Sequence, residues 1–225
     1  MTRFLDLILS SAAFVVLIPL LAPLALLLSC TGEGKVFYRQ ERIGRGKKRF
    51  YLLKFATMLE DSPNLPGGDI TSGNDPRVLP IGKYLRKTKI NELPQLINIL
   101  VGELSVIGPR PLTPKNFEMY NTDVQEMISK VRPGLSGIGS TVFRDEEAVI
   151  ALSPKSSIKC YQEDISPYKG KLECWFIDNK SFLLYLALIL ITVWIVLFPK
   201  SKIIWKIFPE LPSPPKNLIE FLNYN

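Results

Sequence analysis

The residues with the clearest chemical potential lie between Arg86 and Asn98, in the stretch RKTKINELPQLIN. Glu92 stands at the predicted start of a helix, with cations just before it. A helix N-terminus favours phosphate, and one carboxylate there can hold a Mg²⁺ ion whose other ligands are phosphates. Glu92 is therefore the candidate metal ligand. The alternative is that Asn91 and Glu92 only cap the helix and complement its dipole, and the spacing alone favours neither interpretation.

Arg110 lies between two prolines in the stretch GPRP, residues 108–111. Proline fixes the backbone on both sides, and arginine binds phosphate oxygens through two donors without losing its charge. The pattern favours a pyrophosphate or headgroup contact, although a surface salt bridge in a proline-rich turn is the alternative. Lys54, at the end of a predicted strand, likewise has two interpretations: it contacts a phosphate, or it is a solvated lysine at the strand end.

A third stretch, residues 132–147, combines glycines, arginines and acids. Its glycines are expected to let the backbone approach a ligand closely, while Arg132 and Arg144 neutralise phosphate. These glycines are Gly134, Gly137 and Gly139. The acids that follow, Asp145, Glu146 and Glu147, are most typical of a helix start.

The composition excludes several classes of chemistry. The 225 residues contain no histidine, which removes histidine-based nucleophilic catalysis and histidine-liganded zinc. The three cysteines (Cys30, Cys160 and Cys174) form no C-x-x-C pair, so a disulfide framework or a structural zinc site is not expected. No Walker A, G-x-G-x-x-G or Asp-x-Asp signature is present.

The segment that must position these residues, 35–180, is expected to mix helices and strands. Residues 35–39 and 50–55 have strand character on either side of the turn 43–46, and residues 62–80 are rich in loop formers. Apolar residues then recur with helical spacing at Leu93, Leu96, Ile97 and Leu100. Pro94 suits the first turn of that helix, and Asn91 is a good N-cap type.

Two apolar segments flank this region. Residues 7–29 form a run of 23 residues without a charge, long enough to cross a bilayer. Pro19 and Pro23 favour a bend, so a kinked or re-entrant hairpin is as plausible as a straight span. Residues 181–198 form the second membrane-seeking segment, with Trp194 and Trp205 suited to the interface. Residues 209–225 hold four prolines and are expected to be irregular.

The charge pattern indicates a membrane-facing rather than a nucleic-acid-binding surface. The net charge is +7, and residues 35–49 hold seven basic residues against Glu41 alone. By the positive-inside rule this cluster places the main domain in the cytoplasm, against anionic lipid headgroups. No nucleic-acid-binding motif follows, so no nucleic-acid partner is expected.

The order and spacing of these stretches resemble the bacterial sugar transferase family, small monotopic phosphoglycosyl transferases. The resemblance covers about residues 3–200 and rests on seven stretches: RFLDL at 3–7, VFYRQERIG at 36–44, KFATM at 54–58, LRKT at 85–88, ELPQLIN at 92–98, SVIGPRP at 105–111 and VRPGLSG at 131–137.

The resemblance implies an activity and a location. It implies transfer of a sugar 1-phosphate from a UDP-sugar to undecaprenyl phosphate, with Mg²⁺ and release of UMP, at the cytoplasmic face of the bacterial inner membrane. The product would feed polysaccharide or glycan assembly, with inner-membrane lipids and downstream glycosyltransferases as partners. Family members are held by a re-entrant helix broken at Ser-Pro. Because this chain keeps the proline at Ile18-Pro19, the resemblance favours a hairpin broken at Pro19.

The resemblance also exposes a departure. Where the family reads Asp-Glu, with the aspartate as the covalent nucleophile and the glutamate as the metal ligand, this chain reads Asn91-Glu92. Glu92 keeps the Mg²⁺ role, while Lys54, Arg86 and Arg110 keep phosphate or metal-site support. A carboxamide is a poor nucleophile at phosphorus, so Asn91 keeps only the position. Ala56 also replaces a basic residue that is usual in the family.

Three hypotheses follow from Asn91. The lipid phosphate attacks the UDP-sugar directly, another carboxylate such as Asp145 or Glu146 is the nucleophile, or the chain is a silent relative that binds substrates as a scaffold. The retained basic residues and Glu92 favour the two hypotheses in which the protein is an active enzyme. A separate class, a membrane-anchored lipid-binding or assembly protein, would need the basic residues but not Glu92.

The sequence thus predicts an α+β architecture with four parts. These are a re-entrant membrane helix at 1–34, a small cytoplasmic mixed α/β catalytic domain at 35–180, membrane-associated helices at 181–208 and an irregular tail at 209–225.

Overall fold

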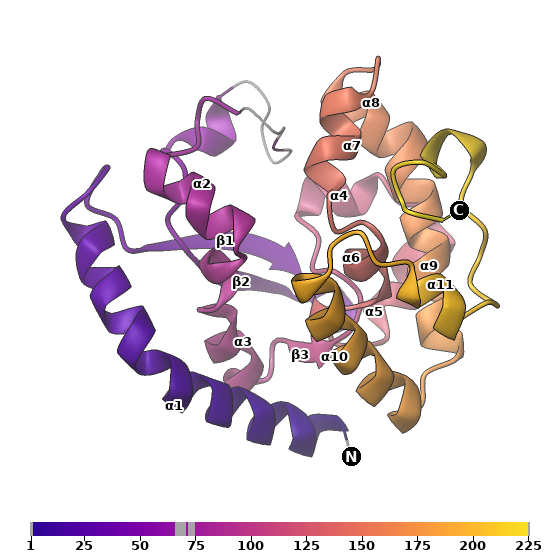
Figure 1. The fold of residues 1–225 in the computed structure, drawn as a ribbon, viewed down its shortest axis with the longest axis horizontal. Helices are drawn as coiled ribbons and strands as arrows, with labels where there is room; N and C mark the ends of the chain where they lie inside the picture. Colours follow the sequence, from indigo (N-terminus) through magenta and orange to yellow (C-terminus); the bar gives the residue numbers. More distant parts are fainter. Residues whose placement is uncertain (1, 66–70, 72–74, 225) are drawn as a thin grey trace.

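The computed structural model describes residues 2–65, 71 and 75–224. Helices surround two small sheets, so the fold mixes both kinds of element as the sequence predicts (Figure 1). Part of the loop expected over 62–80 lies outside the described residues. In the described part, a short turn, η2 (Ser62–Asn64), precedes helix α2 (Pro80–Lys87).

The first sheet is an antiparallel hairpin of β1 (Phe37–Ile43) and β2 (Arg49–Phe55). Its register pairs Ile43 with Arg49, and the short helix η1 (Arg45–Lys47) forms the connection. The expected strands and turn are therefore confirmed. The buried side chains Phe50 and Leu52 anchor the hairpin in a core cluster with helix α3 (Gln95–Val101).

The second sheet pairs β3 (Ser105–Ile107) with β4 (Gly134–Ser136) in parallel. Here the backbones approach each other so closely that a Cβ on Gly134 would lie 2.1 Å from the Gly108 nitrogen, and one on Gly137 would lie 2.1 Å from the Gly108 oxygen. The expectation of a close approach to a ligand is therefore wrong for Gly134 and Gly137, and at Gly139 an added Cβ would instead lie 2.3 Å from the Glu173 carboxylate. Gly134 and Gly137 allow two loops to pack together, because no side chain fits between them.

Short helices complete the remainder of the domain and bury most of the hydrophobic core. In chain order they are η3 (Ile90–Glu92), α4 (Pro114–Glu118), α5 (Thr122–Ser129), α6 (Ile138–Val142), α7 (Glu146–Leu152), α8 (Ser157–Cys160), the π-helical turn η4 (Tyr161–Ile165), α9 (Ser166–Asp178), α11 (Ile203–Ile207) and η5 (Lys216–Leu218). The longest of them, α9, packs against α5 and α6. This core supports the loops that carry the candidate site residues.

Helix α1 (Thr2–Ser29) is long and apolar enough to cross a membrane. It curves along one side of the molecule beside α3 (Figure 1). The helix is continuous through Pro19 and Pro23, so the expected break at Pro19 is wrong. A proline removes one backbone hydrogen bond, and the neighbouring turns of a long helix can carry the chain past it with a bend.

Asp6 joins α1 to the rest of the protein through a buried polar network. Its carboxylate accepts hydrogen bonds from the Ser105 hydroxyl at 2.9 Å, the Val106 amide at 2.8 Å and the Tyr185 hydroxyl at 2.5 Å. Asp6 is only 1% exposed. A buried carboxylate is tolerated when several donors satisfy it, so this network fixes the position of α1 along the domain.

Helix α10 (Phe182–Leu197) is the second apolar helix, and the hydroxyl of Ser181 caps it by accepting from the Leu184 amide at 3.1 Å. One face packs into the core through residues such as Leu188, while Leu190 and Leu197 on the other face are exposed. A helix that is apolar on both faces needs a second apolar environment for the face that the protein leaves uncovered.

The segment after α11 has little regular structure, as the sequence predicts, but it is packed rather than loose. Leu211, Leu218 and Leu222 are buried in the main core. The Tyr168 hydroxyl donates to the Pro212 carbonyl at 2.6 Å, and the Trp205 indole donates to the Leu222 carbonyl at 3.1 Å. The tail is therefore part of the domain core.

Candidate active site

A cavity of about 460 Å³ brings together residues from distant parts of the chain. The hairpin, η3, the loop after β3, and helices α7 and α10 all contribute to its lining. Seven of the site residues predicted from the sequence line it: Lys54, Arg86, Asn91, Glu92, Arg110, Arg144 and Glu146. This cavity is the candidate active site, and its volume suits a small-molecule ligand.

Lys54 and Glu92 form the centre of its polar side. The Lys54 Nζ atom lies 3.9 Å from Glu92 Oε1, and both side chains are mostly buried. Burial lowers the pKa of Lys54 to about 7; the charge of Glu92 opposes this shift, and nearby arginines add to it. The solvated strand-end alternative for Lys54 is therefore wrong, because the strand delivers this side chain to a buried carboxylate.

Glu92 remains ionised in spite of its burial. Burial raises its pKa, but the positive charges of Lys54 and Arg110 outweigh this effect and hold the pKa below the usual range. The Arg110 guanidinium has no hydrogen-bond partner among the described residues, and its backbone amide donates to Glu173 at 3.3 Å. An arginine held by its backbone with a free guanidinium is well suited to bind a phosphate.

Asn91 lies in η3, one turn before α3, and is 4% exposed. The expected N-cap role is wrong, because the helix begins later, after Pro94, and no side chain caps η3 or α3 by a hydrogen bond. Within the described part of the chain, the Asn91 Oδ1 atom has no hydrogen-bond partner. An unsatisfied buried acceptor costs stability, so its presence beside a cavity indicates a ligand as its partner.

The side-chain oxygens of Asn91 and Glu92 suit a Mg²⁺ ion whose remaining ligands are substrate phosphates. Among the described residues, no three acids or cysteines are grouped so that they could hold a metal ion, so this part of the chain offers no all-protein metal cage. Mg²⁺ is usually bound by one or two protein oxygens together with waters and substrate phosphates. The Glu92 carboxylate and the unsatisfied Asn91 Oδ1 atom both line the cavity and are oxygen ligands of this type.

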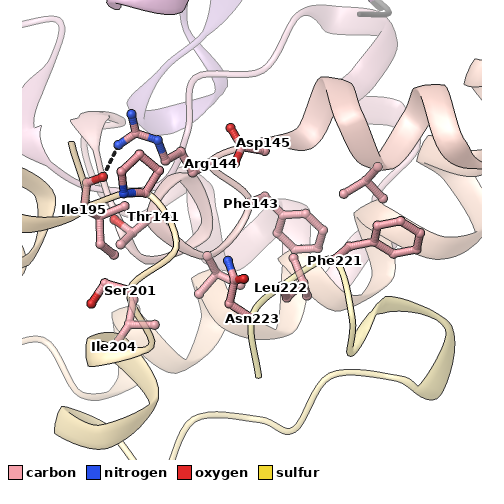
Figure 2. Close-up of a pocket in the computed structure, with 13 residues that line it drawn as sticks. Thr141, Phe143, Arg144, Asp145, Ile195, Ser201, Ile204, Phe221, Leu222 and Asn223 are labelled. Atoms are coloured by element: carbon pink, nitrogen blue, oxygen red, sulfur yellow. Dashed lines mark hydrogen bonds between the residues drawn. The ribbon is translucent and has the colours of Figure 1, made fainter. Parts of the chain in front are cut away.

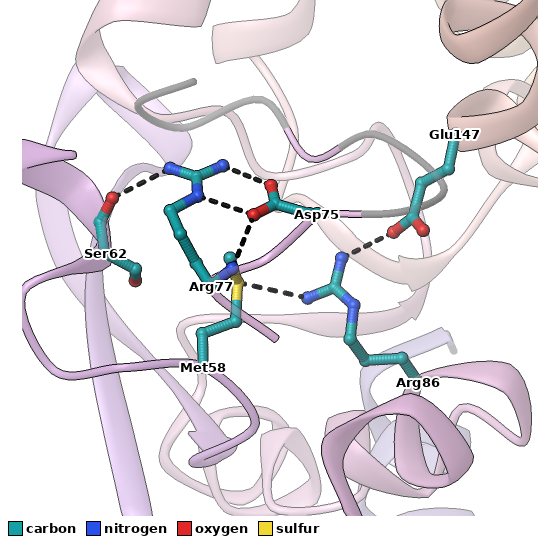
Figure 3. A network of polar contacts seen from close by, with 6 residues as sticks. All are labelled: Met58, Ser62, Asp75, Arg77, Arg86 and Glu147. Atoms are coloured by element: carbon teal, nitrogen blue, oxygen red, sulfur yellow. Dashed lines mark hydrogen bonds and ion pairs between the residues drawn. The ribbon is translucent and has the colours of Figure 1, made fainter. Parts of the chain in front are cut away.

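Arg86 forms the outer edge of the site, where its guanidinium is paired with Glu147 of α7 and also contacts the Met58 sulfur at 3.6 Å (Figure 3). Beside it, Arg77 binds Asp75 through two donors at 2.8 and 2.5 Å and donates to the Ser62 carbonyl at 2.8 Å. The sequence did not predict this buried pair. It fixes the chain next to Arg86 and so helps to position the edge of the cavity.

Glu146 also lines the cavity, where it is paired with the buried Lys169 of α9. Burial raises the pKa of Glu146, but the charges of Lys169 and Arg110 outweigh that effect and hold it below its usual range. Behind them, Glu173 is buried and its pKa is raised to about 7 by desolvation. The acidic helix start predicted at 145–147 thus places two acids, Glu146 and Glu147, in the lining of the cavity.

Two other predicted residues lie elsewhere. Asp145 is exposed and lines a separate pocket of only about 20 Å³, which is too small for a nucleotide (Figure 2). The Arg132 guanidinium donates to the Gly102 carbonyl at 2.9 Å, at the C-terminal end of α3. The cavity lining does not include Arg132, which satisfies a helix end instead.

Arg144 contacts both the large cavity and the end of helix α10. It lines the large cavity, and its guanidinium also donates to the Ile195 carbonyl (Figure 2) and to the Val196 carbonyl at the end of α10. These carbonyls are among the last four of the helix, which have no partner within it. Arg144 therefore connects the polar side of the cavity to α10.

The α10 side of the cavity is mostly apolar. Ile189, Val193 and Val196 line it, whereas Thr192 donates its hydroxyl back to the Leu188 carbonyl at 2.7 Å. The cavity therefore has a charged wall and a hydrocarbon wall. Such a site can accept a ligand that carries a phosphate at one end and an apolar chain at the other.

Sequence reasoning missed several cationic or polar lining residues, which are Arg42, Lys89, Tyr161 and Lys169. Arg42 lies within a stretch that carried the family resemblance, and Lys89 lies two residues before Asn91, so both offered a signal. Lys169 offered none, because a lysine in the middle of a helix usually faces solvent and this one is 1% exposed.

Comparison with known proteins identifies the family. Residues 1–199 match the family model described as bacterial sugar transferase. The chain belongs to the bacterial sugar transferase family. That assignment covers both apolar helices α1 and α10 together with the whole lining of the large cavity.

Similar members of the bacterial sugar transferase family include three curated proteins. The exopolysaccharide production protein ExoY of Sinorhizobium fredii is 34% identical over 158 residues, 64% of this chain and 70% of that protein. A putative undecaprenyl-phosphate N-acetylgalactosaminyl 1-phosphate transferase of Bacillus subtilis is 34% identical over 132 residues, 59% and 73% of the two chains. UDP-N-acetylgalactosamine-undecaprenyl-phosphate N-acetylgalactosaminephosphotransferase of Aeromonas hydrophila is 31% identical over 185 residues, 80% of this chain but 40% of that longer protein.

Proposed function

We propose that the protein is an initiating phosphoglycosyl transferase. It moves a sugar 1-phosphate from a UDP-sugar to undecaprenyl phosphate, giving a polyprenyl-diphosphate-sugar and UMP for polysaccharide or glycan assembly. The names of its relatives support both substrates. The observation that carries the proposal is that a single cavity joins the buried set Lys54, Glu92 and Arg110 to the apolar side of α10.

The charged wall suits the diphosphate of a UDP-sugar. Arg110 offers an unpaired guanidinium, Lys54 an ammonium group, and Arg86 a guanidinium at the edge of the cavity. Glu92, together with the Asn91 Oδ1 atom, would hold Mg²⁺ next to them. When bound, the metal would neutralise charge on the diphosphate and so favour departure of UMP. Arg144, at the junction with α10, would contact the phosphate of the lipid acceptor.

Two apolar surfaces support a position at the bacterial cytoplasmic membrane, with the catalytic domain on the cytoplasmic side. Helix α1 packs along the domain on one face and exposes apolar residues such as Val16 and Leu26 on the other. A helix held in this way lies beside the domain, which fits a re-entrant or interfacial position better than a perpendicular span. The exposed face of α10 is the second apolar surface.

The substrate-binding scaffold without turnover is the weaker alternative. A binding scaffold for lipid headgroups needs positive charge, but it has no need for a buried carboxylate that remains ionised between Lys54 and Arg110. Ionisation of Glu92 requires these charges to offset desolvation. Retaining such an arrangement is expected of a site where the carboxylate acts on a ligand.

Release of UMP tests the proposal. The full chain, purified in detergent, is supplied with Mg²⁺, undecaprenyl phosphate and a panel of UDP-sugars, and UMP is measured for the native protein and for Glu92→Gln. We expect lipid-dependent UMP release that EDTA abolishes and that Glu92→Gln lowers at least about 100-fold. The matched control is Glu118→Gln, which alters an exposed acid in α4. Equal activity of the native protein and Glu92→Gln would contradict the proposal.

A further inference from the structure

The carboxylates that line the cavity are held in different ways. Glu92 lies against Lys54, and Glu147 is paired with Arg86 with 46% of its side chain exposed. Glu146 is paired with Lys169, whose side chain is only 1% exposed. Lys169 contacts one oxygen of Glu146, Oε2, and the structure gives the other oxygen, Oε1, no hydrogen-bond partner among the described residues.

Glu146 and Glu92 share the same cationic environment. Although burial lowers the pKa of Arg110, the negative charges of Glu92 and Glu146 raise it, so both carboxylates act on one guanidinium. Lys89 likewise acts on both acids, and the side chains of all four residues line the same cavity. A phosphate bound to Arg110 would therefore lie near the metal-binding carboxylate Glu92 and also near Glu146.

The position next to Glu92 carries no nucleophile. Asn91 presents a neutral amide oxygen, which is a weak nucleophile at phosphorus, and this oxygen suits metal or phosphate coordination better. Enzymes that form covalent intermediates use an ionised or activated group. Among the carboxylates that line the cavity, Glu146 is ionised, fixed by a buried lysine and left with one unengaged oxygen.

We propose that Glu146 is the nucleophile that takes the sugar phosphate in this enzyme, with Lys169 as the residue that positions it. This inference rests on the proposed transferase function and specifies its chemical route. It replaces the direct attack of the lipid phosphate by two successive displacements at the same phosphorus.

The two steps balance without a further reactant. First, Glu146 Oε1 forms a bond to the phosphorus that bears the sugar, while the bond from that phosphorus to the bridging oxygen breaks. The electron pair leaves with the bridging oxygen as UMP. Second, an oxygen of polyprenyl phosphate attacks the same phosphorus, and the acyl–phosphate bond breaks. The carboxylate of Glu146 is thereby regenerated.

Isotope exchange tests the first step on its own. Labelled UMP is incubated with unlabelled UDP-sugar, Mg²⁺ and the full chain in detergent, without polyprenyl phosphate. A covalent route returns label to the UDP-sugar, whereas direct attack by the lipid returns none. We expect exchange by the native protein and a loss of at least about 1,000-fold in Glu146→Gln. The control Asp145→Asn changes the adjacent exposed acid outside the cavity and should exchange like the native protein.

A labelling experiment does not depend on the folding of a variant. The native protein is incubated with a UDP-sugar that carries ³²P in the phosphate next to the sugar and is then quenched. An acyl phosphate keeps this label on the protein and releases it with hydroxylamine. Peptide mapping should place it on the peptide that contains Glu146.

The outcomes separate this inference from the proposed function. Lipid-dependent UMP release without exchange or labelling would overturn the role of Glu146 and leave the transferase function standing. Exchange retained by a folded Glu146→Gln, or label mapped to another residue, would do the same. No UMP release from any UDP-sugar would overturn both.

Discussion

The Lys54 Nζ atom lies 3.9 Å from Glu92 Oε1, although one residue is the penultimate residue of a β-strand and the other belongs to a short helical turn 38 positions later. The two side chains compensate each other in a mostly buried corner of the cavity. Burial disfavours the charged form of both side chains. The opposite charge of the partner offsets part of this cost as long as the pair is intact. Removal of either partner is therefore expected to disturb the charge of the remaining one.

Replacement of Lys54 by methionine should weaken binding of UDP-sugar. The variant keeps the aliphatic stem but loses a charge-assisted contact to phosphate, which is worth about 1.5–3 kcal/mol, or roughly 10- to 100-fold in Kd. Titration calorimetry with the proposed donor measures this loss. The control is Lys83→Met on the exposed side of α2, and equal Kd values for both variants would exclude Lys54 from the binding site.

Asn91→Ala should separate stability from activity. The substitution removes a buried acceptor without a protein partner, so the free energy of unfolding should stay within about 1 kcal/mol of the native value. UMP release should fall by at least about 10-fold, because the metal or phosphate loses an oxygen ligand. Thermal unfolding and turnover, measured on the same preparation, check both halves. A stability loss that matches the activity loss would point to a purely structural role.

Arg110 and Arg132 should respond differently to replacement by lysine. Lysine cannot offer the planar pair of donors that Arg110 presents to a phosphate, so Arg110→Lys should raise the KM for UDP-sugar about 10-fold or more. Arg132→Lys affects a contact to the Gly102 carbonyl and should change KM little while lowering Tm by a few degrees. Steady-state kinetics on the two variants distinguish them, and the opposite pattern would reverse the assignments.

Glu173 should make the protein less stable as the pH rises. Its pKa is raised from 4.5 in the unfolded chain to about 7 in the folded protein, so the native state holds a proton that the unfolded state loses. Stability from this group is fully present below pH 4.5 and is lost as the pH rises through about 7, by an amount on the order of 3 kcal/mol. In Glu173→Gln the amide remains neutral and can still accept from Arg110, so the Tm difference between variant and native should grow from pH 5 to pH 8. A constant difference would contradict the shifted pKa.

Asp6→Ala should destabilise the protein by about 3 kcal/mol, because it leaves the hydroxyls of Ser105 and Tyr185 and the Val106 amide without their acceptor. Asp6→Asn keeps one acceptor oxygen and should cost much less. Thermal unfolding in detergent measures both, and limited proteolysis reports whether α1 has detached. Similar losses for the two variants would show that the charge of Asp6, rather than its hydrogen bonds, holds α1.

Much of the architecture was predictable because it depends on local patterns. The strand-like composition of residues 35–39 and 50–55 around a turn predicted the hairpin, and the apolar runs at 7–29 and 181–198 predicted α1 and α10. The start of α3 was placed too early, since Asn91 has the right residue type for a cap but belongs to the preceding turn. The break at Pro19 was also predicted incorrectly, because packing of α1 along the domain supports a continuous helix.

The site was predictable where one residue type is chemically distinctive in its local setting. Arg110 and Glu92 fulfil this condition, and both line the cavity. Arg132 does not, because an arginine that satisfies a helix end looks the same in sequence as one that binds phosphate. Lys169 and Glu173 escaped notice because their importance comes from burial, which depends on packing between elements that are distant in the chain.

The hydrogen bond between Asp6 and Tyr185 joins residues 179 positions apart. At about 5–20 residues per second, the ribosome makes the tyrosine roughly 10 to 40 s after the aspartate. The donors from β3 are made about half-way through that interval, and the donor from α10 is made only at its end. Until Tyr185 is made, the carboxylate of Asp6 lacks one of its three donors, so α1 is not yet held in its final position against the domain. The final seating of the helix is an event of late synthesis, when the two ends of the fold first meet.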